Sequence, residues 1–185
     1  MKKICVFDID GVLNNYPVCW IEFINLKLNK NFNCLNEVKE NLSFKKYKEL
    51  KEDYRLSGYK LNIKVNEKAC NKIKQLKKDG YIVIIISSRP IIKYPSLYNL
   101  TQEWLIKNDI KFDNLIFSIR KQYDILIQYP EMNFMVEDNR MIANILGKLG
   151  YKVYLISNKY NEGELENNVI KIKNFEEIQE GKNAN

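Results

Sequence analysis

The sequence contains no histidine, and this absence excludes several classes of enzyme. Without an imidazole, a Ser-His-Asp or Cys-His mechanism cannot operate, and zinc or iron sites with histidine ligands cannot form. Any acid–base chemistry must therefore come from carboxylates, lysine, tyrosine or cysteine.

Closely spaced cysteines and long apolar runs are also missing. No two of the four cysteines stand in C-x-x-C spacing, which excludes a zinc ribbon and a dithiol redox motif. The apolar run of residues 4–9 is too short for a secretory signal and is interrupted by Asp8. No run approaches the ~20 residues of a membrane span. We therefore expect a soluble, cytoplasmic protein with no membrane partner. Its cysteines have apolar neighbours and are expected to be reduced structural thiols; they are Cys5, Cys19, Cys34 and Cys70.

The length and the charge set broad limits on what is present. A chain of 185 residues, 45% of them hydrophobic, suits one domain with room for an inserted sub-domain. The net charge of +7 permits an anionic partner such as a nucleotide or a nucleic acid. The lysines are spread along the expected helices, so a biased coding composition is the simpler explanation. Nothing in the sequence indicates an oligomeric state.

Short β-branched runs alternate with helical patterns along most of the chain. The strand-like runs cover residues 4–7, 81–86, 115–117, 134–136, 151–156 and 169–172. Helical periodicity fills the gaps, at residues 69–76, 97–105 and 141–149. This order predicts an α/β fold, with a Rossmann-like three-layer core around a mainly parallel sheet. Ligands of such sheets bind beyond the carboxyl ends of the strands.

One long stretch breaks the alternation. Between Asn14 and about Lys64 only helical patterns occur, and structureless loops of that length are uncommon. We therefore expect a small helical cap at residues 14–64, inserted after the first strand, with the core domain formed by residues 1–13 and 65–175. The polar residues 176–185 are expected to form a C-terminal tail.

Two acidic pairs follow predicted strands. Asp8 and Asp10 stand in Asp-x-Asp-Gly after the first strand, and Glu137 and Asp138 close another. Carboxylates gathered at one sheet edge would repel each other unless a hard cation lay among them, and oxygen ligands without histidine or thiolate point to Mg²⁺. A strand-ending turn, a glycosyltransferase-type Asp-x-Asp, and a helix N-cap at the second pair are the alternatives.

Two further segments could bind a phosphoryl oxygen. The turn Ser87-Ser88-Arg89 follows a predicted strand and offers hydroxyls and backbone N–H groups. Lys121, at the start of a predicted short helix, could bring an ammonium to the same oxygens. An ordinary serine turn and a solvated lysine are the alternatives.

The order strand–Asp-x-Asp, strand–Ser, Lys, strand–Glu-Asp resembles that of the haloacid dehalogenase-like (HAD) phosphohydrolase superfamily. The resemblance implies that Asp8 is the nucleophile and that Asp10 is the general acid–base, with its main-chain carbonyl on Mg²⁺. It further implies that Ser87, Ser88 and Lys121 bind the phosphoryl group. Asp138 would hold the metal with support from Glu137.

Within that superfamily the chain is most similar to the 5′-nucleotidase type C group, which includes 5′(3′)-deoxyribonucleotidases. The residues that carry this similarity are Asp-Gly-Val, the helical insertion, Ile-Ser-Ser-Arg-Pro and Thr101-x-x-Trp104-Leu105. The chain also resembles the 3′-phosphatase domain of polynucleotide kinase–phosphatases. The resemblance therefore implies a Mg²⁺-dependent phosphomonoesterase that acts through an aspartyl-phosphate on a small phosphorylated substrate, a nucleotide.

Two alternatives remain open. A 3′-phosphatase on nucleic-acid ends would lose kcat/KM steeply with added salt, because a polynucleotide releases counterions when it binds. A phosphate-binding regulatory protein would keep the fold without turnover. The cap aromatics Trp20, Phe23, Phe44, Tyr47 and Tyr54 could stack on a base, but their helical spacing is more typical of packing residues.

Overall fold

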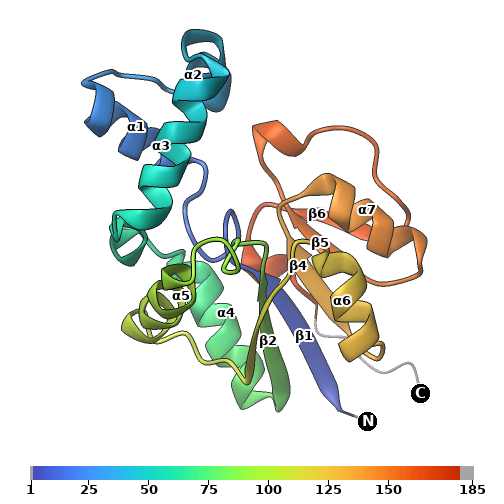
Figure 1. Cartoon of the computed structure of the whole chain (residues 1–185). Coiled ribbons are helices and arrows are strands. Elements are labelled where there is room, and N and C mark those ends of the chain that lie inside the picture. Colours follow the sequence, from blue (N-terminus) through green and yellow to red (C-terminus); the bar gives the residue numbers. More distant parts are fainter. Residues whose placement is uncertain (1, 180–185) are drawn as a thin grey trace.

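The computed structural model describes residues 2–179, and in this range six strands form one parallel sheet (Figure 1). The strands are β1 (Lys3–Asp8), β2 (Tyr81–Ser87), β3 (Asn114–Phe117), β4 (Phe134–Glu137), β5 (Val153–Ile156) and β6 (Val169–Ile172). The core helices are α4 (Glu67–Lys78), α5 (Ser96–Lys107), α6 (Lys121–Gln128) and α7 (Arg140–Lys148). None of the described helices is both long and apolar enough to cross a membrane.

The strand order places β1 at a reversal point of the sheet. The order is β3-β2-β1-β4-β5-β6, so the chain builds outward from β1 on one side and continues from β4 on the other. Beside such a reversal the loops after the two central strands diverge and leave a crevice at their carboxyl ends. Asp8 is the last residue of β1 and Glu137 is the last residue of β4, so Asp8 meets the second acidic pair at this crevice.

Two hydrophobic clusters cover the two faces of the sheet, which confirms the three-layer α/β core. On one face, Phe7 and Ile85 pack against Ile73 of α4 and Trp104 of α5. On the other face, apolar strand residues pack against α6 and α7, for example Ile125 and Leu146. Because both faces are covered, the strands read as continuous apolar runs rather than as alternating ones.

The chain between β1 and α4 forms a small group of helices, here called the cap. The cap contains α1 (Val18–Leu28), α2 (Leu35–Asn41), α3 (Phe44–Leu56) and the short 3₁₀ helix η1 (Tyr59–Asn62). Trp20, Phe23 and Tyr54 are fully buried at its centre, in a hydrophobic cluster separate from those of the sheet. An antiparallel bridge between Asn14 and Val65 joins the segments that lead into and out of the cap. In Figure 1 the cap stands beyond the carboxyl ends of β1 and β2.

The structure differs from the sequence expectation just after residue 175. A short 3₁₀ helix, η3 (Phe175–Glu177), brings Ile178 against the sheet, where it is buried beside Phe175. The backbone of Gln179 then exchanges hydrogen bonds with the Tyr154 hydroxyl. Because the residues around Ile178 are polar, the sequence pattern does not reveal that Ile178 packs against the core. The expected C-terminal tail, residues 176–185, therefore includes residues that belong to the core. Residues 180–185 lie outside the described part of the chain.

Candidate active site

Asp8 is the last residue of β1, and its carboxylate is buried at the crevice between β1 and β4. Lys121, the first residue of α6, places its Nζ 2.7 Å from Asp8 Oδ1 and 2.8 Å from Glu137 Oε2. All three side chains are almost completely buried. Lys121 therefore pairs with both Asp8 and Glu137, whereas the binding of phosphoryl oxygens expected for it stays a prediction.

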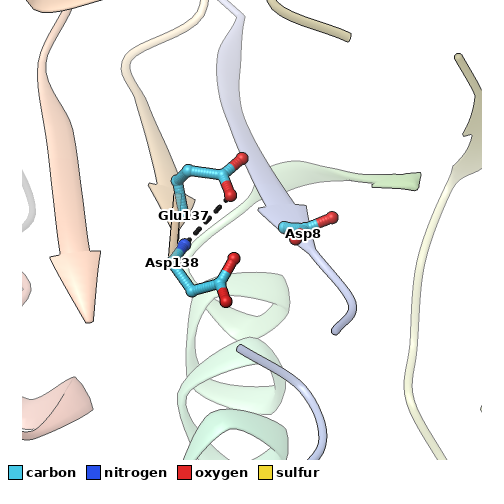
Figure 2. Close-up of side chains that lie close together, drawn as sticks. All are labelled: Asp8, Glu137 and Asp138. Carbon is cyan, nitrogen blue, oxygen red and sulfur yellow. Dashed lines mark hydrogen bonds between the residues drawn. The ribbon is translucent and has the colours of Figure 1, made fainter. Parts of the chain in front are cut away.

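Asp8, Glu137 and Asp138 form a cluster of carboxylates (Figure 2). One oxygen from each lies within 4.8 Å of the others, and the side chains project from the ends of β1 and β4. Glu137 Oε1 accepts hydrogen bonds from the backbone N–H groups of Asp138, at 3.0 Å, and Asn139, at 2.9 Å. These bonds hold Glu137 at the base of the cluster. One alternative from the sequence is that the second acidic pair caps the following helix. In the structure the N-cap of α7 is Asn139 instead, whose side chain accepts hydrogen bonds from the first turn of the helix.

The electrostatics of this cluster favour a bound cation. Burial, with repulsion from Glu137, raises the pKa of Asp8 to about 7 against the attraction of Lys121. Burial and the charges of Asp8 and Glu137 raise the pKa of Asp138 to about 9. One ammonium thus stands among three buried carboxylates. The donors are all oxygen, which fits a hard divalent ion such as Mg²⁺.

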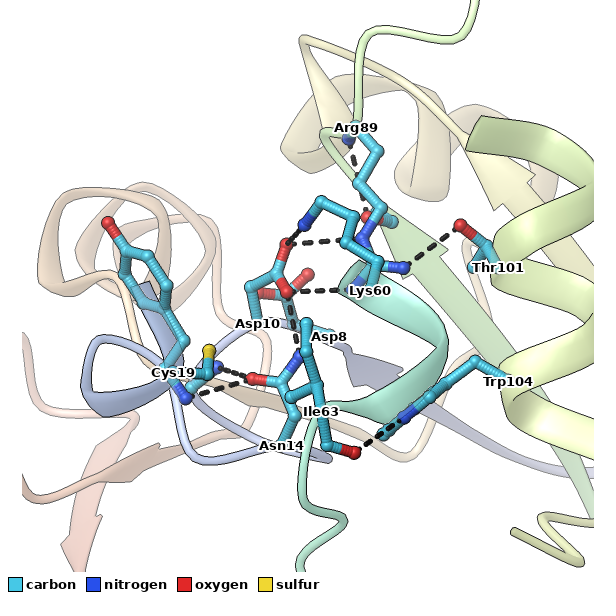
Figure 3. Close-up of polar contacts among 12 residues, drawn as sticks. Asp8, Asp10, Asn14, Cys19, Lys60, Ile63, Arg89, Thr101 and Trp104 are labelled. Carbon is cyan, nitrogen blue, oxygen red and sulfur yellow. Dashed lines mark hydrogen bonds and ion pairs between the residues drawn. The ribbon is translucent and has the colours of Figure 1, made fainter. Parts of the chain in front are cut away.

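Asp10 does not join the carboxylate cluster. Its side chain turns toward the loop after β2, where the Arg89 guanidinium binds it with two hydrogen bonds (Figure 3). Arg89 Nη2 donates to Oδ1 at 2.8 Å, and Nε donates to Oδ2 at 3.2 Å. Asn14 Nδ2 donates to Oδ1 at 2.7 Å, and Lys60 Nζ lies 4.0 Å from Oδ2. The metal role expected for Asp10 concerned its main-chain carbonyl, and that role stays a prediction.

The partners of Asp10 keep it ionised. Burial by itself would raise the pKa of Asp10, but the charges of Arg89 and Lys60 and the hydrogen bonds of Arg89 and Asn14 outweigh burial. Together they hold the pKa well below its usual value. About 30% of the Asp10 side chain remains exposed, so the carboxylate is accessible from the cavity described below.

Gly11 lets the loop after β1 approach the second acidic pair. Its φ of +88° is a left-handed conformation that L side chains rarely adopt. A Cβ at this position would lie only 2.2 Å from Asp138 Oδ2. The glycine of the Asp-x-Asp-Gly motif is therefore required both by the backbone turn and by the close contact with Asp138.

The predicted phosphate-binding residues surround the same opening. Ser87 ends β2 and is buried, and its Oγ accepts a hydrogen bond from the backbone N–H of Arg89 at 3.3 Å. Ser88 follows it and is exposed. Both serines and Lys121 line a cavity of about 580 Å³ together with Asp8, Asp10 and Asp138.

Several residues at the site escaped prediction from the sequence. The Tyr160 hydroxyl donates a hydrogen bond to Asp138 Oδ2, and Asn161 Nδ2 donates to the Asp138 carbonyl at 2.8 Å. Both belong to the 3₁₀ helix η2 (Lys159–Asn161) after β5. The only sequence signal for them is their position after a parallel strand. Arg89 belongs to the Ser-Ser-Arg turn, but sequence spacing does not predict that its partner is Asp10.

The cap lines the cavity mainly with cations, beside Tyr16, Leu35 and Tyr54. Lys39, Lys51 and Arg55 line it from α2 and α3, and Lys60 lines it from η1. Of the five cap aromatics considered from the sequence, only Tyr54 is among the lining residues, and it is 1% exposed. Trp20 and Phe23 are buried in the cap, so their role is packing.

The chain is similar to known phosphatases. No family model matches it. A curated nucleotidase of Clostridium acetobutylicum is 26% identical over 184 residues, which cover 95% of this chain and 91% of that protein. The D,D-heptose 1,7-bisphosphate phosphatase of B. bronchiseptica, solved with magnesium and phosphate, has a TM-score of 0.57 at 10% identity and covers 93% of each chain.

A third similarity is partial. A chain in the structure of the Pnkp1/Rnl/Hen1 complex has a TM-score of 0.53 at 16% identity. The match covers 84% of this chain but only 46% of that one, so the present chain spans less than half of its length. These solved structures share the fold seen here.

Proposed function

We propose that this chain, an enzyme of the HAD phosphatase type, is a Mg²⁺-dependent phosphomonoesterase that acts through an aspartyl-phosphate on Asp8 and dephosphorylates a nucleotide. The observation that carries the proposal is the setting of Asp8. Its carboxylate ends the central strand β1, contacts Lys121, lies beside Asp138, and opens into the cavity.

Asp8 is suited to nucleophilic attack because its carboxylate, once a bound cation offsets the repulsion that raises its pKa, needs no base to deprotonate it. Its oxygen attacks the phosphorus of the substrate, and the bond from phosphorus to the leaving oxygen breaks. Lys121 and the hydroxyls of Ser87 and Ser88 bind the phosphoryl oxygens and reduce the repulsion between the two anions.

Asp10 is proposed as the general acid–base. It lines the same cavity, and in the substrate-free protein its carboxylate is ionised and can accept a proton from the water that hydrolyses the aspartyl-phosphate. A phosphate dianion raises the pKa of Asp10 as it enters, because it adds negative charge and competes for Arg89. This change favours the protonated form that donates to the leaving oxygen.

The metal site is proposed at the carboxylate cluster. Asp8 and Asp138 would hold the ion with Glu137 in support, and the main-chain carbonyl of Asp10 would complete the protein ligands. When bound, Mg²⁺ neutralises charge on carboxylate and phosphoryl oxygens. Three buried carboxylates with one ammonium between them are the feature of this chain that supports the assignment.

Labelling of the intermediate tests the mechanism. We expect Asp8→Asn to abolish Mg²⁺-dependent hydrolysis of p-nitrophenyl phosphate. We also expect that this variant takes up no ³²P when it is incubated with a ³²P-labelled phosphomonoester. Asp10→Asn should slow turnover by about 10²-fold or more, the usual loss for a general acid–base. It should also accumulate acid-stable, hydroxylamine-labile label on Asp8, because the attacking water lacks its base.

The matched control is Asp109→Asn, an exposed carboxylate that pairs with Lys74 and Lys111 away from the cavity. This variant should retain the wild-type rate. Circular dichroism and the melting temperature establish that each variant folds. Turnover by folded Asp8→Asn, or label on a residue other than Asp8, would refute the proposed nucleophile.

A second candidate is a polynucleotide 3′-phosphatase. The partial likeness to the Pnkp1/Rnl/Hen1 complex and the cations of the cap favour it. The nucleotidase similarity covers nearly the whole of both chains and favours the mononucleotide.

A further inference from the structure

The cavity holds more positive charge than one phosphate group requires. Its lining includes seven lysine and arginine residues against three aspartates. Lys121 pairs with Asp8, and Arg89 and Lys60 face Asp10. These three cations therefore face the aspartates around which the scissile phosphate is proposed to react. The cations left over are Lys39, Lys51, Arg55 and Arg140.

Among these four remaining cations, Lys51 and Arg55 have the most restricted side-chain positions. They are four residues apart on α3, so they lie on the same face of the helix, one turn from each other. In the described part of the chain neither has a carboxylate partner, whereas Asp53 and Glu52 on the same helix pair with Lys27 and Lys93. Adjacent like charges on a helix are unfavourable unless an anion lies between or above them.

Aromatic rings hold both cations in place. Lys51 Nζ lies over the rings of Trp20, at 4.3 Å, and Tyr16, at 5.2 Å. The Arg55 guanidinium lies 5.3 Å from the ring centre of Tyr94, which comes from the core loop after β2 and donates a hydrogen bond to Glu52 at 2.9 Å. Arg55 is thus positioned where cap and core meet. Held in this way, the cations lose little conformational freedom when they bind an anion.

The environment of Lys51 makes an anionic ligand favourable. Burial, with the nearby charge of Arg55, lowers the pKa of Lys51 to about 8 against the attraction of Asp10. A desolvated ammonium near a second cation gains more from an incoming phosphate than a solvated surface lysine does.

We propose that Lys51 and Arg55 form a subsite for a second phosphate group, so that the preferred substrate carries a phosphate besides the one that is hydrolysed. This inference rests on the proposed function and narrows its substrate class. A nucleoside bisphosphate and the phosphodiester next to a 3′-phosphorylated end both offer this chemistry. The cap contributes charge recognition, because four of its residues that line the cavity are lysines or an arginine, namely Lys39, Lys51, Arg55 and Lys60.

Substrate comparison tests the subsite. Steady-state kinetics are measured with adenosine 5′-monophosphate, adenosine 3′-monophosphate, adenosine 3′,5′-bisphosphate and a 3′-phosphorylated dinucleotide. We expect Lys51→Met and Arg55→Met each to raise KM about tenfold or more for the substrates with two phosphates. KM for the monophosphates should change less than twofold. The second phosphate of the preferred substrate is that of a free nucleoside bisphosphate if adenosine 3′,5′-bisphosphate has the higher kcat/KM. It is the phosphodiester of a strand if the 3′-phosphorylated dinucleotide has the higher kcat/KM.

The matched control is Lys48→Met. Lys48 lies on the same helix and stacks over the Phe44 ring at 4.3 Å, but it does not line the cavity. It should leave all four substrates unchanged. If Lys51 and Arg55 only brace the cap, their variants will lower the melting temperature and impair every substrate equally, and the subsite is refuted.

Failure of the proposed function gives a different result. If the wild-type protein hydrolyses none of the four compounds, the phosphomonoesterase proposal fails. Calorimetric titration of adenosine 3′,5′-bisphosphate against the wild-type, Lys51→Met and Lys48→Met proteins still decides the subsite. Equal affinities, or no binding, would overturn it, and a selective loss in Lys51→Met would support it.

Discussion

Gly11 shows how one residue type links the backbone to the reaction centre. The positive φ of Gly11 and its close approach to Asp138 are two separate constraints, and any side chain at this position would violate both of them. We expect Gly11→Ala to lose about 1–2 kcal/mol of stability from the left-handed backbone. We also expect it to lose at least about 10²-fold in kcat, because the new methyl group must displace the Asp138 carboxylate. Urea denaturation and the rate at saturating Mg²⁺ measure the two effects.

Gly58 provides the control for backbone strain alone. Its φ is +71°, but a Cβ there would meet nothing within 4 Å. Gly58→Ala should therefore lose a similar amount of stability and keep its kcat. An unchanged rate in Gly11→Ala would show that the position of Asp138 does not matter for turnover.

The residues that could be predicted at this scale are those that follow a buried strand. Asp8, Ser87 and Glu137 end strands, and the parallel sheet brings such ends to one edge, so their proximity follows from the sequence pattern. The direction of Asp10 could not be predicted in this way. It depends on Arg89, which is 79 positions away, and on Asn14 in the following turn.

At the scale of elements, the cap and α5 are joined by Trp104. Its indole Nε1 donates to the Ile63 carbonyl at 2.8 Å, where the chain returns from the cap to the core. Three residues earlier, Thr101 Oγ1 accepts a hydrogen bond from Arg89 Nη1 at 2.9 Å. The Thr-x-x-Trp pattern therefore connects one helix to both the Asp10 partner and the base of the cap.

The indole hydrogen bond should be measurable. Trp104→Phe keeps a ring in the core but leaves the buried Ile63 carbonyl without its donor, and such a loss costs about 1–3 kcal/mol. We expect this loss of stability in urea denaturation, with a larger effect on KM than on kcat because the reaction centre is not touched. A kcat that falls as far as in Asp10→Asn would contradict this division.

The helices and strands whose apolar residues recur at regular spacing could be predicted from the sequence, and those without such spacing could not. The six strands and helices α4, α5 and α7 followed from buried apolar runs and helical faces. Helix α2 has only seven residues and one fully buried side chain, Val38, so its apolar period is too short to identify the helix from the sequence. Ile178 escaped for a related reason, since one buried residue in a polar segment produces no pattern.

At the scale of the whole molecule, the carboxylate cluster links stability to pH and to metal. The pKa values of Asp8 and Asp138 are raised to about 7 and about 9, whereas unfolded aspartates titrate near 4. The folded chain therefore holds protons that the unfolded chain has lost, and stability decreases as pH rises from about 4 toward 9. The proposed divalent ion would replace those protons when it binds.

We expect the melting temperature in EDTA to fall between pH 5 and pH 8.5, and Mg²⁺ to raise it more at pH 8.5 than at pH 5. A difference of about 2 kcal/mol would correspond to roughly 4–8 °C for a chain of this size. Asp138→Asn should remove most of the pH-dependent Mg²⁺ effect. This comparison separates the carboxylates from Lys60, whose pKa is lowered to about 7 by burial and by Arg89 and which acts in the opposite direction. An equal Mg²⁺ shift at both pH values would contradict the assignment.

The bridge between Asn14 and Val65 brings the two ends of a fifty-residue excursion side by side. Segments with adjoining ends can be exchanged for others without disturbing the frame that carries them. We therefore expect that the cap can be replaced as one segment during evolution, which would change substrate preference and leave the proposed catalytic residues of the core in place.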